Sequence, residues 1–291
     1  MGKCLTMEKV AELSKRVDHV FLPSLQRARG EGRITTKQGD GITRLDRLYQ
    51  SGCAKIRLPH THSSALEAVL INTAGGLTGG DRMDWLAEIA PHGKAVLTTQ
   101  ACERIYRSLG GPATVHTRLA VGVNAHLDWL PQETILFASS QLDRRIDIDL
   151  ADGASLTAIE AILLGRDAMG EIALDARLRD NWRIRRNGRL IHAEATRLDG
   201  TLAERNGLSL LAGKRAFATV LHIAPDPETC ANRLQRLRDT LPDDSRIAAS
   251  ANGERLTVRV LAQTGLAMRR LIVPILAELS GAGSLPRLWH L

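Results

Sequence analysis

Histidine, cysteine and carboxylate side chains are the residues of this sequence that could bind a metal ion. His60 and His62 alternate on a segment that, if extended, places both imidazoles on one side. The nine histidines and four cysteines are otherwise scattered, with no HExxH motif and no CxxC pair. The pattern therefore predicts a transient or interfacial metal contact at most, and no enclosed catalytic metal site.

Polar pairs recur along the middle of the chain. Gln100 and Glu103, Gln132 and Glu133, and then Glu160 stand at the same stage of a repeated unit. Carboxylates placed in this way could line a polar channel or act as general bases. The alternative is ordinary polarity at the edge of each repeat.

The glycine cluster NTAGGLTGGD at 72–81 does not have the form of a phosphate-binding loop. Such a loop needs lysine and then serine or threonine after its last glycine, whereas Asp81 follows Gly80. Glycines here supply positive φ angles and close backbone approach, which predicts a tight structural or interface loop. The chain also lacks a GxSxG nucleophile motif. By side-chain chemistry alone, nothing identifies an enzyme.

An internal repeat organises the strand-like region between about residues 33 and 200. The segments 87–100, 119–132 and 148–161 each combine an apolar alternation, a turn, an alanine and a second alternation. The matching alanines are Ala95, Ala125 and Ala154, spaced 30 and 29 residues apart. This spacing predicts stacked β-hairpins or the coils of a β-helix-like body. Chance similarity among hairpins is the alternative.

The last third changes from strands alone to strands and helices. The sequence predicts a strand over 216–223 and a helix from Asp226-Pro227, followed by a hairpin turning at Asn252-Gly253. A second helix begins at Thr264 and is bent or interrupted at Pro274. These elements predict a small βαββα-type part with two helices.

We therefore expect a mainly β fold in three segments that form one structural unit. Residues 1–32 form an N-terminal helix and linker, 33–215 a β-rich repeat-like body, and 216–291 an α+β part packed on that body. No secretory signal or membrane-spanning run is visible, which predicts a cytoplasmic protein.

The net charge is +7, and seven arginines face four acids between Arg166 and Arg189. Nucleic acid and an acidic protein both suit such a surface. Single-strand binding usually needs stacking aromatics, and the chain has only four Trp, two Tyr and three Phe. An acidic protein partner or a solvated face is therefore favoured over nucleic acid.

Five blocks of the sequence resemble the urease accessory protein family UreD, also called UreH. They are NTAGGLTGGDRM (72–83), TTQACERIYRS (98–108), LDWLPQETILF (127–137), LLGRDAMGE (163–171) and RDNWRIRRNGRLIHAEATRLDG (179–200), and the closing PRLWHL is similar to the usual end of that family. The blocks come in the family's order, from about residue 40 to the end.

The resemblance implies a non-catalytic adaptor with a β-rich, helical-coil-like fold. UreD-like proteins bind urease apoprotein and UreF, which recruits the GTPase UreG, and nickel is thought to pass through the interior of UreD. No tightly bound cofactor is expected, Ni²⁺ would bind only transiently, and GTP would bind only UreG. The alternatives are a basic nucleic-acid-binding module and an independent metal-dependent hydrolase.

The same resemblance and the polar pattern give a set of candidate site residues. Expected at a partner interface or channel are Gly75, Gly76, Gly79, Gly80, Asp81, Gln100, Glu103, Arg104, Tyr106, Arg107, Glu133, Thr134, Gly165, Arg166 and Glu171. Those expected to guide Ni²⁺ are Glu103, Glu133, Glu171, His60 and His62, because a cation in transit needs ligands that release it.

Overall fold

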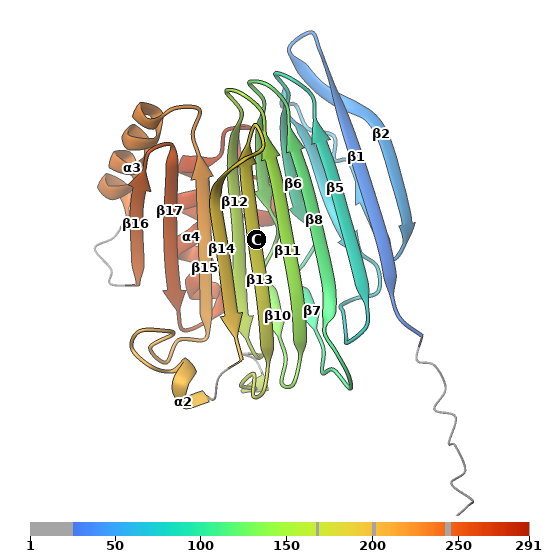
Figure 1. The fold of residues 1–291 in the computed structure, drawn as a ribbon, viewed down its shortest axis with the longest axis vertical. Helices are drawn as coiled ribbons and strands as arrows, with labels where there is room; N and C mark the ends of the chain where they lie inside the picture. The colour runs from blue at the N-terminus through green and yellow to red at the C-terminus, as the bar shows by residue number, and fades with distance from the viewer. Residues whose placement is uncertain (1–25, 167–168, 200–201, 242–245, 291) are drawn as a thin grey trace, which may run out of the picture.

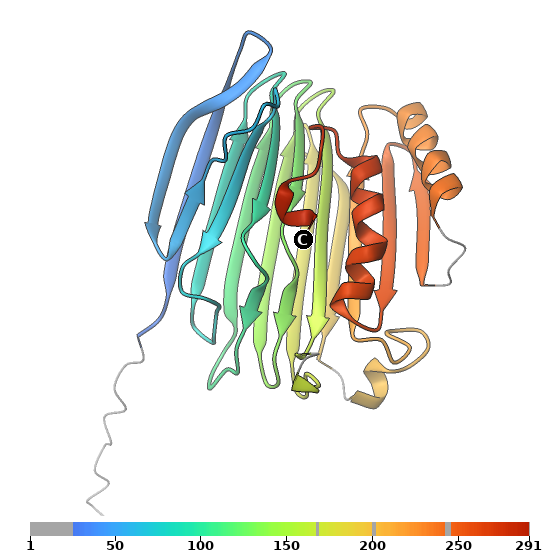
Figure 2. The same cartoon turned by 180° about the vertical axis from the view of Figure 1, so that it is seen from behind.

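Two β-sheets lie face to face along most of the molecule, with helices on one side only (Figures 1 and 2). The computed structural model describes residues 26–166, 169–199, 202–241 and 246–290. The predicted N-terminal helix lies outside these residues. Within the described ranges, no helix is both long and apolar enough to cross a membrane.

The seven-stranded sheet is called sheet 1 and the ten-stranded sheet is called sheet 2. Sheet 1 has the order β14-β13-β11-β8-β5-β1-β2, with bounds β1 (Arg29–Gly39), β2 (Ile42–Gly52), β5 (Arg82–Ile89), β8 (Ala113–Val121), β11 (Gln141–Leu150), β13 (Arg177–Arg186) and β14 (Arg189–Leu198). Sheet 2 has the order β16-β17-β15-β12-β9-β6-β4-β3, with bounds β3 (Ala54–Arg57), β4 (Leu66–Asn72), β6 (Lys94–Thr99), β9 (His126–Leu130), β12 (Ser155–Leu164), β15 (Ala216–Ile223), β16 (Ile247–Asn252) and β17 (Arg255–Ala262). Two short strands complete sheet 2, β7 (Glu103–Ile105) and β10 (Thr134–Leu136).

The chain winds from one sheet to the other and back, as in a β-solenoid. Strands β5, β8, β11 and β13 pair in parallel in sheet 1, and β4, β6, β9 and β12 pair in parallel in sheet 2. Successive strands of the sequence therefore alternate between sheets, so each coil buries the face of its neighbour. The predicted mainly β, coil-like fold is confirmed. At both ends of each sheet the outermost strand is antiparallel to its neighbour.

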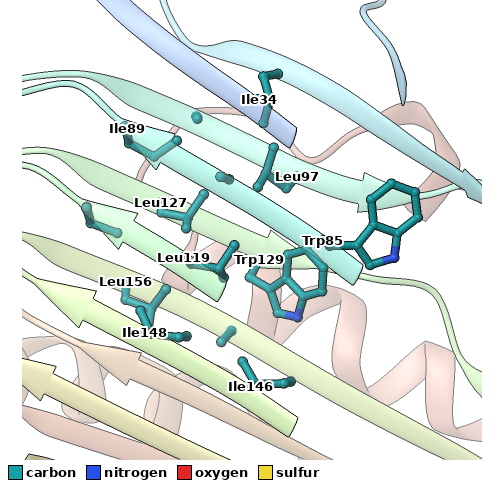
Figure 3. Close-up of a cluster of buried hydrophobic side chains, with 14 of the residues drawn as sticks. Ile34, Trp85, Ile89, Leu97, Leu119, Leu127, Trp129, Ile146, Ile148 and Leu156 are labelled. Carbon is teal, nitrogen blue, oxygen red and sulfur yellow. The ribbon is translucent and has the colours of Figure 1, made fainter. Parts of the chain in front are cut away.

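The core lies between the two sheets, where alternate residues of each strand point inward. Leu97, Leu127 and Leu156 come from neighbouring strands of sheet 2 and face Leu119 and Ile148 of sheet 1 (Figure 3). All five side chains are 3% exposed or less. Burial of such side chains contributes about 1.5–3 kcal/mol each, so stacking of coils stabilises the fold.

The repeated turn shows the true register of the repeat. His92, Asn124 and Gly153 all have positive φ, of 60°, 54° and 63°, directly before the sheet-2 strands. Ala125 and Ala154 follow that turn, as the sequence predicted. Ala95 does not match them, because it pairs with Leu127. The alignment of Ala95 with Ala125 is therefore wrong by two residues.

The C-terminal part contains the predicted βαββα order. Helix α3 (Pro227–Thr240) begins after the N-cap Asp226, whose carboxylate accepts from the Thr229 amide at 2.7 Å, and α4 (Gly265–Leu279) follows the N-cap Thr264. Both helices of the prediction are confirmed. The hairpin turns one residue later than predicted, at Gly253 and Glu254, because Asn252 pairs with Arg255.

The C-terminal part and the body share one sheet. Strand β15 pairs with β12 of the last coil, so sheet 2 continues into the C-terminal part. Helix α4 covers the outer face of sheet 2 (Figure 2). Two shorter elements complete the chain, α2 (Leu202–Arg205) and the 3₁₀ helix η2 (Arg287–Trp289). At the other end, β1 begins at Arg29, inside the segment predicted as helix and linker.

Gly32 is expected to be intolerant of a side chain. A Cβ atom at this position would lie 2.3 Å from Cζ3 of Trp85, whose ring packs between the sheets. We expect Gly32→Ala to lower the free energy of unfolding by about 2 kcal/mol, measured by urea denaturation. Gly39→Ala on the same strand is the control, because its Cβ would meet only Arg44 at 3.7 Å. Equal stability of the two variants would contradict the expected clash.

Candidate functional site

Two strands of sheet 2 are interrupted at the polar residues of the repeat. Strand β6 ends at Thr99 and β7 begins at Glu103, while β9 ends at Leu130 and β10 begins at Thr134. The neighbouring β12 runs on without a break and pairs with β9 over its first half and β10 over its second. Pro131 has no N–H to donate to a ladder, which favours the second interruption.

A small cavity of about 50 Å³ lies beside these interruptions, between the two sheets. This volume suits one or two water molecules. Polar and aromatic side chains from both sheets line it: Trp85, Thr117 and Arg144 from sheet 1, and Glu103, Trp129, Gln132, Thr134 and Glu160 from sheet 2. The cavity is therefore a polar site between the apolar clusters that fill the space between the two sheets.

Arg144 is the cation of this site and joins the two sheets. Its guanidinium donates to Asp180 on β13 at 2.7 and 3.2 Å, and to the Thr134 hydroxyl of sheet 2 at 3.1 Å. It also forms an ion pair with Glu160 of sheet 2 at 2.5 Å. All three charged side chains are 7% exposed or less. A buried charge of this kind requires such partners.

Burial and the neighbouring Arg144 have opposite effects on the pKa of Glu160. Burial raises the pKa of its carboxyl to about 7, the charge of Asp180 acts in the same direction, and Arg144 opposes the rise. The indole N–H of Trp129 donates to Oε1 at 3.2 Å. Burial therefore disfavours the charged form of Glu160, and the Arg144 guanidinium beside it favours that form.

Glu103 lies at the start of β7 and also lines the cavity. Burial raises the pKa of its carboxyl to about 7, although the Asn72 amide, which donates to both of its oxygens at 3.1 and 3.3 Å, favours the charged form. Asn72 is the first residue of the glycine-rich segment 72–81, and its contact with Glu103 is structural, in line with the structural loop predicted there. The cavity thus carries two carboxyls that change charge in the same pH range.

Glu133 lies on the opposite face of sheet 2. Thr134 pairs with Glu103, so the preceding Glu133 points the other way. Its carboxylate accepts from Arg269 of α4 at 3.2 Å, and the Cys102 thiol lies 3.5 Å from it. Burial, followed by the nearby Glu133, raises the pKa of Cys102 to about 12, so this thiol stays protonated.

The C-terminal residues close over that outer face. Arg269 donates to the Leu288 carbonyl and lies over the Trp289 ring, at 4.9 Å from its centroid. The Trp289 indole donates to the Leu130 carbonyl at 3.1 Å. Glu133 is thus part of the contact that holds the tail against sheet 2.

The loops at one end of the solenoid gather most of the other predicted residues. The term loop surface denotes residues 75–81, 104–109, 165–166 and 169–172. The Tyr106 ring meets the Phe137 ring edge-on, with 5.1 Å between their centroids, and the Arg166 guanidinium lies over the Phe137 ring, 4.7 Å from its centroid. Arg166 also forms an ion pair with Glu171. These contacts join the second and third loops.

The glycine loop packs directly beneath Tyr106. Gly76 has φ of 145°, and a Cβ there would lie 2.4 Å from the Tyr106 ring, which agrees with the predicted close approach. The Asp81 carboxylate accepts from the amides of Ala28 and Thr78, both at 2.8 Å. Asp81 therefore holds the loop in shape.

Aliphatic side chains protrude from the same surface. Leu109 is 79% exposed, Met169 70% and Ile172 42%. Exposed apolar side chains grouped beside aromatic and arginine side chains are typical of protein–protein interfaces. Glu171 belongs to this surface: partial burial disfavours its charge, but the Ala138 amide and Arg166 outweigh it and lower the pKa.

The structure does not bring the five predicted nickel-guiding residues together. Glu103 faces the interior, Glu133 the covered face of sheet 2, and Glu171 the loop surface. His60 and His62 lie in an exposed loop, where His62 lines a separate hollow with Glu67. Among the described residues, no three His, Cys, Asp or Glu side chains are grouped to hold a metal ion.

Of the other predicted residues, Thr134 contacts Arg144 in the interior, while Gln100 is exposed at the first interruption. Sequence reasoning missed Arg144 and Asp180. Both occupy inward positions of apolar alternations, Arg144 between Leu142 and Ile146, and Asp180 between Leu178 and Trp182. A charged residue at the inward position of an apolar alternation is the sequence signal that could have identified them.

Glu103→Gln is expected to change how stability depends on pH. The folded chain keeps this proton up to about pH 7, whereas the unfolded chain releases it near 4.5. Stability contributed by the protonated carboxyl is therefore lost as pH rises from about 4.5 through about 7. Relative to the unaltered protein, the variant should gain free energy of unfolding between about pH 5 and about pH 8, measured by urea denaturation. Exposed Glu88→Gln is the control, and a parallel pH profile for both variants would contradict the assignment.

Comparison with known proteins places the chain in a family. The model of the UreD urease accessory protein family matches residues 28–290. A urease accessory protein UreD of Chelativorans sp. (strain BNC1) is 60% identical over 92% of this chain and 95% of the relative. Proteins of the same name from Rhizobium johnstonii and Agrobacterium fabrum are each 47% identical over 91% of this chain, covering 96% and 92% of their own lengths. The chain therefore belongs to the UreD family of urease accessory proteins.

Proposed function

We propose that the chain is an adaptor that binds urease apoprotein and UreF, and through UreF the GTPase UreG, so that nickel reaches the urease active site. Family membership makes it an accessory protein of urease maturation and not an enzyme in its own right. In this proposal GTP binds only UreG, nickel is cargo, and assembly takes place in the cytoplasm.

The polar cavity between the sheets is the observation that carries the nickel part of the proposal. Glu103 and Glu160 each have a pKa of about 7, so each can exchange a proton for a divalent cation near neutral pH. Oxygen ligands bind nickel more weakly than a cysteine and histidine cage, and they therefore allow its release.

The loop surface supports the adaptor part. It combines exposed Leu109 and Met169 with the Tyr106–Phe137–Arg166 contacts, and aromatic, methionine and arginine side chains are enriched at protein–protein interfaces. We assign this surface to accessory-protein binding. Glu171 then acts there by ordering Arg166 and not as a nickel ligand.

Co-expression tests the adaptor role. The tagged chain would be expressed with UreF, UreG and the urease subunits, and each partner would be assayed in the eluate. We expect co-purification, and loss of nickel-dependent urease activity when this chain alone is deleted. Purification of the chain alone, with urease activity unaffected by its deletion, would overturn the proposal.

Loss of the two interior carboxyls is expected to reduce nickel loading. Glu103→Gln with Glu160→Gln should lower the nickel content of co-expressed urease by about threefold or more, because two oxygen ligands lose their charge. Nickel is measured by atomic emission on purified urease, and complex formation by co-purification. Glu133→Gln with Glu171→Gln is the matched pair, since both lie outside the cavity.

The two double variants distinguish a nickel path through the cavity from one that uses Glu133 and Glu171. A nickel deficit confined to the interior pair, with the complex intact, supports passage through the cavity. A nickel deficit in the Glu133 and Glu171 pair as well would instead favour the three glutamates expected from the sequence, Glu103, Glu133 and Glu171. Normal loading in both pairs would exclude a carboxylate path.

A further inference from the structure

A row of arginines follows the outer face of sheet 1, the face opposite the cavity. Alternate residues of a strand point to the same side, and on β13 the outward positions from 177 to 185 carry four arginines around Asn181. No helix among the residues that the structure describes covers this face, which lies toward the viewer in Figure 1. The row begins near one end of β13 and follows its whole length.

Three of these arginines make no close ion pair with a described residue, although Arg179 and Arg177 lie near enough to Asp199 to lower its pKa. Arg177, Arg179 and Arg183 are exposed and form no ion pair with any residue that the structure describes. Arg185 differs, because it lies 3.7 Å from Asp147. The first three guanidinium groups are therefore available to a ligand.

The neighbouring strand adds to the positive charge. Arg179 pairs directly with Arg197 of β14, and both side chains lie on the outer face. Like charges that face each other across a sheet are destabilising. The Arg197 side chain, followed by Arg179 and Arg177, holds the pKa of Asp199 below its usual range. Asp199 is thus a single exposed carboxylate close to three arginines.

The basic strip is narrow. On its other side β11 carries Asp143, Asp147 and Asp149 on the outer face. Asp147 is already bound by Arg145 and by His116, which lies 3.0 Å away. Acidic side chains therefore flank the strip, and the positive charge covers the width of about one extended chain.

We propose that this strip, Arg177, Arg179 and Arg183, bordered by Arg197 in its ion pair with Asp199 at 2.6 Å, docks an extended acidic segment of a partner protein. Outward side chains on β13 are about 6.6 Å apart, the same spacing as alternate side chains of an extended peptide. Arginine binds carboxylates in a bidentate manner. Stacking of nucleic-acid bases is not provided, because Trp182, the aromatic residue of β13, is 1% exposed and faces the core.

A synthetic peptide of alternating Glu and Thr, about twelve residues long and labelled with fluorescein, tests the strip on the purified full chain. We expect saturable binding by anisotropy that weakens as salt rises. Arg177→Gln, Arg179→Gln and Arg183→Gln together should weaken it about tenfold or more. Arg57→Gln, Arg238→Gln and Arg270→Gln, which remove three exposed arginines elsewhere, should change it by no more than about twofold.

Control ligands and a charge-reversal variant test whether binding is specific to an acidic peptide and to the strip. An alternating Gln and Thr peptide, single-stranded RNA and duplex DNA are measured in the same way. Equal losses in both triple variants, or tighter arginine-dependent binding of either nucleic acid, would overturn it. Arg179→Glu places a carboxylate between Arg197 and Asp143, so it should abolish peptide binding while leaving the melting temperature nearly unchanged. Loss of binding together with a lower melting temperature would indicate a structural role instead.

Discussion

The ion pairs of Arg144 are the interaction on which the interior of this fold depends. One guanidinium, buried between two sheets, is bound by Asp180 on its own sheet and by Glu160 on the other. Breaking such a buried set by removing one partner destabilises a protein by about 3–5 kcal/mol, because the remaining charge is left without compensation. The set therefore ties the two sheets together while keeping polar groups inside the solenoid.

This polar layer separates two apolar cores. Ile146, next to Arg144 on the inward face, belongs to the cluster formed with Leu127 and Trp129. Leu142, on its other side, belongs to the cluster formed with Leu77 and Ile105 near the loop surface. The strand interruptions lie at the same level, so the coil pattern changes where the interior becomes polar. The site and the irregularity of the sheet are thus one feature.

Local signals predicted the fold well where they were strong. The cap residues Asp226 and Thr264 mark the helix starts observed, because a carboxylate or hydroxyl before a helix satisfies free amides. The repeat predicted a β-solenoid, but Ala95 was placed out of register, since the first coil contains extra residues between turns. Spacing between similar residues cannot reveal such insertions, whereas the positive-φ turns at His92, Asn124 and Gly153 do.

The site was harder to predict from the sequence. Glu103 and Glu133 look equivalent along the chain, yet an offset of one residue places them on opposite faces of sheet 2. Arg144 and Asp180 come together from strands that are neighbours in space but separated by a full coil. Only the pairing of β11 with β13 makes them partners.

The antiparallel strands at the sheet ends determine where the run of parallel coils stops. A stack of parallel coils exposes, at each end, a backbone ladder on which an identical coil of another molecule can continue. Here β2, β3, β14 and β16 reverse the chain direction at the four edges. The run of parallel coils therefore stops before each of these edges. The number of parallel coils is thus set within the chain, by the reversed strands that flank them.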